Sequence, residues 1–504
     1  MQKPLFIVLL CLFFLAASCS GLKYEKYPKE EFRGVWVATV VNIDWPKNGN
    51  DHVAKQKKDF LRILDFYDEL NFNALIVQVR TAGDAFYPSE KAPWSRFLTG
   101  KEGQPKQRFE DPLQWMLDRT HERGMQFHAW FNPYRATFDL DTTLLDTTKH
   151  DFYKHRDWML KYGKKYYYNP GIPEVWEHLT EVVAEVVKNY DVDGVHFDDY
   201  FYPYKIQGEV FNDSLEYATH ALPNQTLGDW RRSNVDSLVK NVHQSIRHNK
   251  PWVQFGISPF GVWKNKSTDP LGSDTKAGQT TYEDLYADPL LWMEKGWIDY
   301  IVPQAYWSMH YPAASHEKIA TWWASQTEDT ELYMGNGPYK IRNNADEAWN
   351  DKKELPKQLA MARNLPEVQG NVFFSAKSLM GQHEDVVKFL RKKFYKYPTA
   401  FPIEKNEALT ERLPAVAKLS KKGKGIELCV SHFDSIPRFV SIYGLKNPSN
   451  PKEKQFLQRG YIPRNESESC IFIASRKFKY LGFSIQDMYG NKTELQTINL
   501  KEAL

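Results

Sequence analysis

The chain has 504 residues, enough for two or three domains, and 42% of them are hydrophobic, so it can bury a large core. Its 66 basic and 63 acidic side chains leave a net charge of only +3, which excludes a protein that binds nucleic acid mainly through charge. An aromatic content of 15% argues against widespread disorder, and four cysteines in so long a chain do not form a disulfide scaffold.

The N-terminus reads as an export signal. Lys3 precedes a short apolar run, residues 5–15, and small residues at 16–18 separate that run from Cys19. This order is typical of a secretory signal and not of a transmembrane helix. A cysteine directly after small residues resembles a bacterial lipobox, so we expect Cys19 to be lipidated and to hold the protein on a membrane. An ordinary signal with an incidental cysteine is the alternative.

Strand-like and helix-like segments alternate through the middle of the chain. Residues 56–70 and 173–190 carry apolar residues at helical spacing. Strands that alternate with helices pair in parallel, so eight such units predict a (β/α)8 barrel. A doubly wound open sheet is the alternative, but no glycine-rich phosphate loop follows any of the strands. The eight expected strands are 33–40, 73–80, 125–132, 192–199, 252–260, 299–307, 332–339 and 369–377.

The C-terminal part changes character after a basic segment, residues 418–424, which we expect to be a linker. Short strand-like segments with turn signals and no helix between them then predict a small β-sandwich. The sequence at 487–491 resembles the end of a fibronectin type III domain. Cys429 and Cys470 lie in two of these strands, and either a disulfide or two buried thiols would fit.

Polar residues gather where the expected barrel strands end, which is where such barrels carry their chemistry. The alternation of side chains along a strand places His196 and Asp198 inward and Val195 and Phe197 outward. We expect the inward residues to contact substrate. The candidate substrate-binding residues are Arg80, Trp130, Asn132, Tyr134, His196, Gln304, Trp307, Asn336 and Tyr339.

The adjacent carboxylates Asp198 and Asp199 are the sharpest chemical signal. Two neighbouring carboxylates repel each other, so one of them can keep its proton near neutral pH. Glycoside cleavage needs an acid for the leaving oxygen and an anion to stabilise the developing positive charge. Aromatic rings near the strand ends would stack on the faces of sugar rings. The structural alternative is that Asp199 caps a helix or pairs with an arginine.

Five motifs in this order carry a family resemblance: EFRGVWVATVVNIDWP, QVRTAGDAFYPS, HAWFNPYR, DGVHFDDYFYP and PQAYW. Over roughly residues 30–400 the chain resembles the bacterial family 10-like glycosyl hydrolase lipoproteins. The resemblance implies a (β/α)8 fold, lipid anchoring and glycosidase activity, and one branch of the family cleaves peptidoglycan strands stripped of peptides. The implied organisation is a lipoprotein signal peptide (1–18), a tether (19–30), a catalytic barrel (31–417) and a fibronectin type III-like β-sandwich (425–504).

A second likeness concerns the mechanism. Residues 193–200 match the start of the chitinase motif D-G-x-D-x-D-x-E, but Tyr200 stands where the catalytic Glu would be. Retaining N-acetyl-hexosaminidases with an Asp-Asp pair are closer. There the acetamido oxygen of the substrate attacks, which implies that Asp198 orients that group, Asp199 is the general acid and Tyr306 donates a hydrogen bond. A conventional pair with Asp198 as nucleophile remains open.

Two other classes compete with this interpretation. A metal hydrolase would need ligands such as His128, His196 and Asp198, but the first strand lacks the His-x-His of the metal-dependent barrels. A non-catalytic glycan-binding protein would have little use for paired carboxylates. We therefore expect a cell-envelope glycoside hydrolase, lipid-anchored to the outer membrane, without cofactor or metal. Its partners would be that membrane and peptidoglycan or a dietary or host polysaccharide, and not nucleic acid.

Overall fold

The computed structural model describes residues 28–402, 415–423, 425–432, 437–447, 455–463, 468–473, 478–487 and 492–503. The proposed signal and lipidation site at Cys19 therefore lie outside the described residues. No helix in the described ranges is long and apolar enough to cross a membrane.

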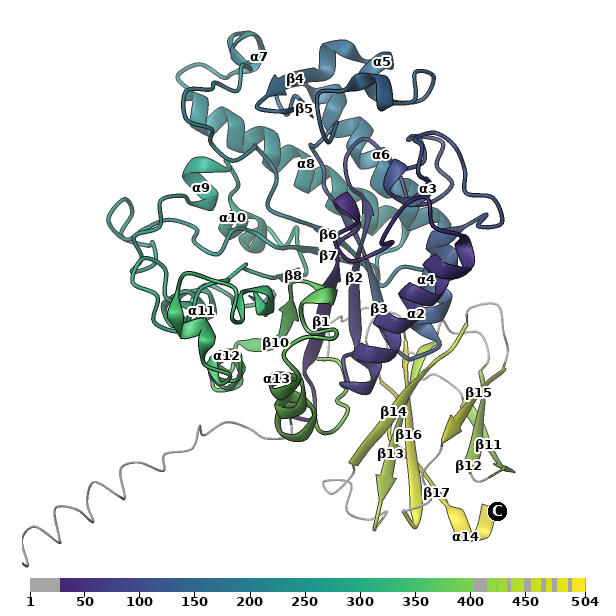
Figure 1. Ribbon diagram of the computed structural model, residues 1–504. Coiled ribbons are helices and arrows are strands. Elements are labelled where there is room, and N and C mark those ends of the chain that lie inside the picture. Colours follow the sequence, from purple (N-terminus) through teal and green to yellow (C-terminus); the bar gives the residue numbers. More distant parts are fainter. Residues whose placement is uncertain are drawn as a thin grey trace, which may run out of the picture.

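Eight parallel strands close into a barrel, as the sequence predicts (Figure 1). Each of the eight expected segments contains or overlaps one barrel strand, and hydrogen bonding between the first and last strands closes the sheet. In order around the barrel the strands are β1 (Phe32–Val37), β10 (Val368–Phe373), β9 (Glu331–Asn336), β8 (Tyr300–Ile301), β7 (Gln254–Ile257), β6 (Gly194–Phe197), β3 (Gln126–Phe131) and β2 (Ala74–Arg80).

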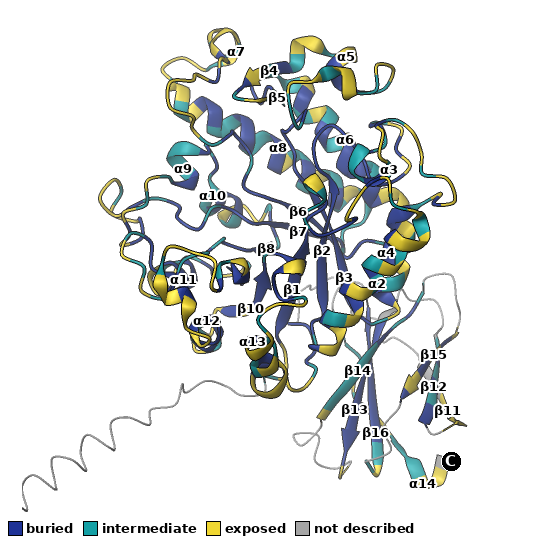
Figure 2. Ribbon diagram, in the orientation of Figure 1, coloured by how far each residue is buried: buried dark blue, intermediate teal, exposed yellow. Residues whose placement is uncertain are grey.

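Helices surround the barrel and cover its apolar outer face. Helix α2 buries Phe60, Ile63, Leu64 and Tyr67 against it, the stripe that helical spacing predicts. Figure 2 shows the barrel strands buried and the outward faces of the surrounding helices exposed. The helices of this layer and its loops are α2 (Val53–Glu69), α3 (Arg96–Thr99), α4 (Pro112–His121), α5 (Asp151–Lys154), α6 (Pro173–Asn189), α7 (Ser214–His220), α8 (Leu227–Asn249), α9 (Thr281–Asp284), α10 (Pro289–Glu294), α11 (His316–Ala324), α12 (Glu354–Ala362) and α13 (Glu384–Phe389).

Large rings fill the inside of the barrel because glycines on the strands leave room for them. A Cβ atom at Gly256 would lie 2.0 Å from the ring of Tyr300, and one at Gly194 would lie 2.4 Å from the ring of His128. The rings of Phe32 and Tyr333 stack 4.1 Å apart below them. The barrel interior is therefore a packed aromatic core that supports the strand ends from beneath.

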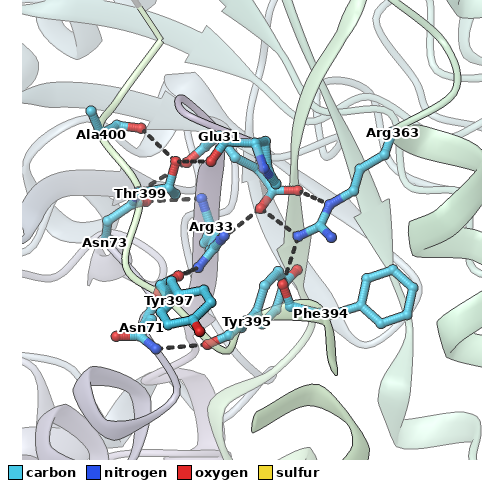
Figure 3. A network of polar contacts seen from close by, with 11 residues as sticks. Glu31, Arg33, Asn71, Asn73, Arg363, Phe394, Tyr395, Tyr397, Thr399 and Ala400 are labelled. Atoms are coloured by element: carbon cyan, nitrogen blue, oxygen red, sulfur yellow. Dashed lines mark hydrogen bonds and ion pairs between the residues drawn. The ribbon is translucent and has the colours of Figure 1, made fainter. Parts of the chain in front are cut away.

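A buried ion network joins the start of β1 to the end of the barrel domain (Figure 3). The carboxylate of Glu31 accepts hydrogen bonds from Nε of Arg33 at 2.6 Å and from Nε of Arg363 at 2.7 Å. Nη1 of Arg33 also donates to the carbonyl oxygen of Tyr397 at 2.9 Å. These contacts fix the 394–400 segment against the opening strand, at the end of the barrel opposite the polar strand ends.

The long segment after β3 folds back over the carboxyl ends of the barrel strands. A two-stranded hairpin, β4 (Met159–Tyr162) and β5 (Lys165–Tyr168), forms there. Its second strand pairs with the residues that follow β3, through an antiparallel bridge between Arg135 and Tyr167. The hairpin thus becomes a wall beside the ends of the barrel strands (Figure 1).

The C-terminal part forms two antiparallel sheets, as expected for a β-sandwich. Cys429 and Cys470 face each other on neighbouring strands and form a disulfide. The three-stranded sheet has the order β11 (Ala415–Lys422), β12 (Gly425–His432) and β15 (Glu468–Ile473). The other sheet has the order β14 (Gln455–Tyr461), β13 (Pro437–Leu445), β16 (Tyr480–Asp487) and β17 (Gln496–Asn499), and helix α14 (Leu500–Ala503) follows it.

The segment 418–424 differs from the expected linker. Residues 418–422 belong to β11, which lies at the edge of its sheet and exposes Lys418 while Leu419 packs against the sandwich core. Lysines are common on edge strands because their charge prevents pairing with other chains. The basic composition therefore marks an edge strand here and not a linker.

Candidate active site

A cavity of about 260 Å³ opens at the carboxyl ends of the barrel strands. Asp198 and Asp199 line it, directly after the end of β6. The residues around them are Trp36, Ala38, Val40, Ile43, Gln78, Trp130, Arg135, Tyr200, Tyr204, Ser258, Gln304, Tyr306, Tyr339 and Phe374. A larger cavity of about 430 Å³ lies near Arg33 at the other end of the barrel, away from the paired carboxylates.

The strand β6 positions the pair as the alternation of its side chains predicts. Val195 and Phe197 belong to the outer apolar core, whereas His196 faces the rings inside the barrel. Asp198 continues the inward set and is almost fully buried. The local sequence therefore places a carboxylate at the top of the barrel core, with a second one beside it at the cavity wall.

Three N–H groups hold Asp198. Its Oδ2 accepts from Nε1 of Trp130 and from Nδ2 of Asn132, both at 3.0 Å, and the backbone N–H of Tyr200 lies 3.4 Å from Oδ1. Burial, followed by the charge of Asp199, raises the pKa of Asp198 to about 7. This side chain is therefore held rigidly and carries a proton affinity suited to chemistry near neutral pH.

Asp199 has a different set of partners. The hydroxyl of Tyr204 donates a hydrogen bond to its Oδ2, and the side chain of Gln304 also contacts it. Burial raises the pKa of Asp199, while these two hydrogen bonds oppose the rise. A hydroxyl oxygen can also accept a proton, so Tyr204 suits either protonation state of Asp199, whereas the N–H partners of Asp198 can only donate.

The structure brings together five of the candidate side chains at the cavity surface or directly behind it. Four of them line the cavity: Trp130, Gln304, Tyr306 and Tyr339. Asn132 lies behind the cavity wall and donates a hydrogen bond to Asp198, which lines the cavity. Burial raises the pKa of Tyr306 well above its usual value, so this phenol keeps its proton and can donate it in a hydrogen bond. Tyr339 is 39% exposed and offers a ring face at the rim.

Five other candidates lie outside the cavity lining. Arg80 is buried and donates from Nη2 to the hydroxyl of Tyr168 at 3.1 Å, which fixes the hairpin. Asn336 bonds to Gln358 at 3.0 Å, and Trp307 packs edge-on against Phe260. His196 lies beneath the cavity, and Tyr134 is fully buried away from it. In this structure these side chains support the walls and do not face the cavity.

Several residues of the cavity lining are absent from the candidate residues that the sequence predicts. Arg135 and Ile43 stand inside the quoted motifs, so their place in those motifs was the signal available for them, and Tyr204 directly follows the motif DGVHFDDYFYP. Ser258 directly follows β7, inside the expected segment 252–260, so the alternation of side chains along that strand was the signal available for it. Gln78, which shares a face of β2 with Arg80 near the polar end of that strand, also lines the cavity, and its Oε1 accepts the backbone N–H of Val40 at 3.0 Å and so shapes the loop after β1.

The structure also separates the residues of the imagined metal site. His128 and His196 both hydrogen-bond to Tyr300 inside the barrel, whereas Asp198 is held by Trp130 and Asn132. Within the described ranges, three potential ligand atoms converge only at Glu427 and the two disulfide-bonded cysteines of the sandwich.

Comparison with known proteins agrees with this geometry. The family model described as "Glycosyl hydrolase-like 10" matches residues 31–351. The chain is 44% identical to Glycosyl hydrolase YngK of Bacillus subtilis (strain 168) over 74% of this chain and 73% of that protein. It is 39% identical to Glycosyl hydrolase DigH of Escherichia coli (strain K12) over 72% of this chain and 88% of that protein.

The likeness to solved structures is weaker. The PgaB (BpsB) glycoside hydrolase domain from Bordetella bronchiseptica is 13% identical, with a TM-score of 0.45, over 72% of this chain and 98% of that chain. The family match and the two relatives, together with a barrel that carries paired carboxylates at its chemical end, lead to one conclusion. The chain belongs to the glycosyl hydrolase-like 10 family and is a glycoside hydrolase.

Proposed function

We propose that this glycoside hydrolase cleaves an N-acetylated glycan, with peptidoglycan strands as its substrate. The observation that carries the proposal is the difference between the partners of Asp198 and those of Asp199. In the free enzyme the pKa of Asp198, raised to about 7 by burial and by the charge of Asp199, means that the pair holds one proton near neutral pH. Partners that only donate favour a charged Asp198 once substrate binds it, and a hydroxyl partner tolerates a protonated Asp199. We therefore place the shared proton on Asp199 in the reactive complex.

The proposed reaction uses the acetamido group of the substrate. Its carbonyl oxygen attacks the anomeric carbon while the glycosidic C–O bond breaks, and the leaving oxygen takes the proton of Asp199. The Asp198 carboxylate accepts the acetamido N–H and stabilises the positive oxazolinium ring, and Tyr306 donates a hydrogen bond to the acetamido oxygen. Water then loses a proton to Asp199 and attacks the anomeric carbon, which restores the acetamido group and retains the configuration.

The wall of the cavity supports a sugar substrate. Trp130, Tyr306 and Tyr339 offer ring surfaces beside the carboxylates. Flat rings pack against the C–H faces of pyranoses, while their polar tips hydrogen-bond to the hydroxyl groups. An acidic pair surrounded by such rings fits polysaccharide hydrolysis.

The test is digestion of purified sacculi, with and without prior amidase treatment, followed by mass spectrometry of the products. Peptide-free glycan fragments that are released from amidase-treated sacculi by the wild type, and not by an Asp199→Asn variant, would support the proposal. Dietary or host polysaccharides are tested in parallel. If the enzyme released fragments from such a polymer and none from sacculi, peptidoglycan would be excluded and that polymer would be identified as the substrate.

We further propose that the enzyme is exported and lipid-anchored through Cys19, in the cell envelope and on the outer membrane. The support is the sequence pattern alone: a basic start, an apolar run and small residues before a cysteine. Cys19→Ala should release the protein from the membrane fraction and block lipid labelling. Normal processing and unchanged membrane association of this variant would contradict the anchor.

A further inference from the structure

Arg135 stands out among the residues of the catalytic cavity because its buried guanidinium keeps a donor without a partner, and the charges of Asp198 and Asp199 act on it only from beyond ion-pair distance. It lines the cavity with the two carboxylates, and it is only 5% exposed. Within the described ranges no carboxylate lies at ion-pair distance from it, and its Nε makes no hydrogen bond. Buried guanidinium groups are normally paired, so this arginine points to a missing anion.

The surroundings of Arg135 hold its guanidinium in place. Nη1 donates to the carbonyl oxygen of Thr81 at 3.1 Å, and the guanidinium carbon lies 4.8 Å from the ring centre of Tyr200. Stacking fixes the plane of the group while its edge keeps donors for a further partner. This arrangement is the one in which arginine binds a planar carboxylate through two parallel hydrogen bonds.

A second cation lies beside it on the hairpin. Lys165 begins β5, the strand whose Tyr167 pairs with Arg135. Burial, followed by the charge of Arg135, lowers the pKa of Lys165 to about 8, and Nζ of Lys165 lies 5.1 Å from the ring centre of Phe138, three residues after Arg135. No carboxylate of the described chain lies at ion-pair distance from Nζ of Lys165 either. Two neighbouring cations with no carboxylate of the described chain at ion-pair distance favour the binding of an added anion.

The hairpin region as a whole has the same bias. Residues 149–168 contain six lysines and arginines against two aspartates. These residues lie on the catalytic side of the barrel (Figure 1). A polymer that runs along this wall would therefore meet positive potential before it reaches the carboxylate pair.

We propose that Arg135 and Lys165 bind a carboxylate of the glycan, so that the enzyme prefers strands that carry an acidic sugar at the catalytic cavity. This inference rests on the proposed cleavage of an N-acetylated glycan and names the charge of that substrate. Two sugar chemistries supply such a group: a lactyl ether on an N-acetylated sugar, as in peptidoglycan freed of its peptides, and the C6 carboxylate of a uronic acid.

The experiment compares substrates that differ only in this charge. Peptide-free peptidoglycan strands are used as such and after conversion of their carboxyl groups to methyl amides. Hyaluronan supplies N-acetylated sugars with uronic acids, and chitin oligosaccharides supply N-acetylated sugars without any acid. For each enzyme the measured quantity is the ratio of kcat/KM on the acidic strands to kcat/KM on the amidated strands.

The ratio should be about tenfold or more for the wild type, since a charge-assisted bidentate contact is lost on amidation. The ratio should approach one in Arg135→Gln. In Lys165→Gln it should be about threefold lower than in the wild type, because the ammonium group of Lys165 contributes only a single point charge. Arg135 also acts on the charge of the catalytic pair, so its variants lower both rates, and the ratio removes this common effect. Lys164→Gln, the same charge change at the exposed neighbouring position, should keep the wild-type ratio.

Each outcome decides one question. Equal rates on acidic and amidated strands by the wild type would overturn the carboxylate site and leave the proposed function intact. No cleavage of any of the four polymers would instead remove the proposed function. Faster cleavage of hyaluronan than of peptidoglycan strands would identify a uronic acid as the source. If Arg135→Gln does not fold, the wild-type ratio and that of Lys165→Gln still decide the case.

Discussion

Nε1 of Trp36 donates a hydrogen bond to Nε2 of His196 at 3.2 Å, directly beneath the catalytic cavity. An indole N–H can only donate, so Nε2 of His196 accepts and its proton sits on Nδ1. That proton points to the hydroxyl of Tyr300 at 3.0 Å, which in turn donates to Nδ1 of His128 at 2.8 Å. Burial lowers the pKa of His128 to about 4 and that of His196 well below its usual value. Both rings therefore stay neutral at physiological pH.

Removal of the hydroxyl in Tyr300→Phe should destabilise the fold. The change leaves two buried ring nitrogens without their partner, and each such group costs about 1–3 kcal/mol. Urea unfolding at pH 7 measures the difference. Tyr339→Phe, at a side chain that is 39% exposed, is the control and should change the stability by less than about 0.5 kcal/mol. Equal stabilities for the two variants would show that the order of hydrogen bonds through Tyr300 is wrong.

The roles of the two carboxylates separate with leaving-group chemistry. Asp198→Asn and Asp199→Asn should each lower kcat on natural glycan by about 10²–10⁴-fold, the usual contribution of a positioned acid or base. An activated aryl leaving group needs little protonation, so it should rescue Asp199→Asn in part and Asp198→Asn not at all. Asp157→Asn, at an exposed position just before the hairpin, should behave as wild type. Rescue of Asp198→Asn alone would exchange the two roles.

The buried pair also makes the stability depend on pH. Burial raises the pKa of folded Asp198 to about 7, whereas an unfolded aspartate titrates near 4. Between these values the folded state binds more protons, so the contribution of Asp198 is complete below about pH 4 and is lost as the pH rises through 7. Wild-type Tm should therefore fall from pH 5 to pH 8, and Asp198→Asn should reduce that fall. A fall in Tm that is unchanged in the variant would contradict this assignment.

Features of the fold and site could be predicted from the sequence where they depend on periodic patterns within a strand, and not where they depend on the path of a loop. The eight barrel strands and the inward position of Asp198 followed from apolar runs with polar ends and from the alternation of side chains. The lining by Ile43 and Tyr204 could not be predicted, because these residues come from loops whose path only the closed barrel defines. Strand β14 of the sandwich could not be predicted individually, since QFLQRGY shows no clear alternation.

Removal of the sandwich after residue 402 should preserve turnover on short soluble substrates and lower the stability. Every described residue of the cavity precedes that point. The sandwich nevertheless covers Phe401, which lies under the guanidinium of Arg459 at 3.7 Å, and its Tyr461 stacks on His121 at 4.2 Å. Exposure of a large apolar side chain costs about 1.5–3 kcal/mol, which differential scanning calorimetry would detect.

Tyr461→Ala in the full chain tests the contact between the sandwich and the barrel without removing the sandwich. It removes the contacts with His121 and Asp191 and should weaken the barrel without unfolding the sandwich. Complete loss of turnover in a folded truncation would mean that the sandwich helps to shape the cavity from a distance.

The sandwich and the first described residues lie at the same end of the barrel. Lys492 of the sandwich contacts Glu30 at 3.3 Å, and Glu30 pairs with Ala400 beside the buried network of Glu31. The cavity lies at the other end, at the carboxyl ends of the barrel strands. Figure 1 shows the hairpin and α7 on that side of the barrel, away from the sandwich. If the enzyme were immobilised through the sandwich or through the first described residues, the cavity entrance would face away from the support, toward glycan strands on the opposite side. Accessory modules fused there could lengthen its reach without narrowing the entrance.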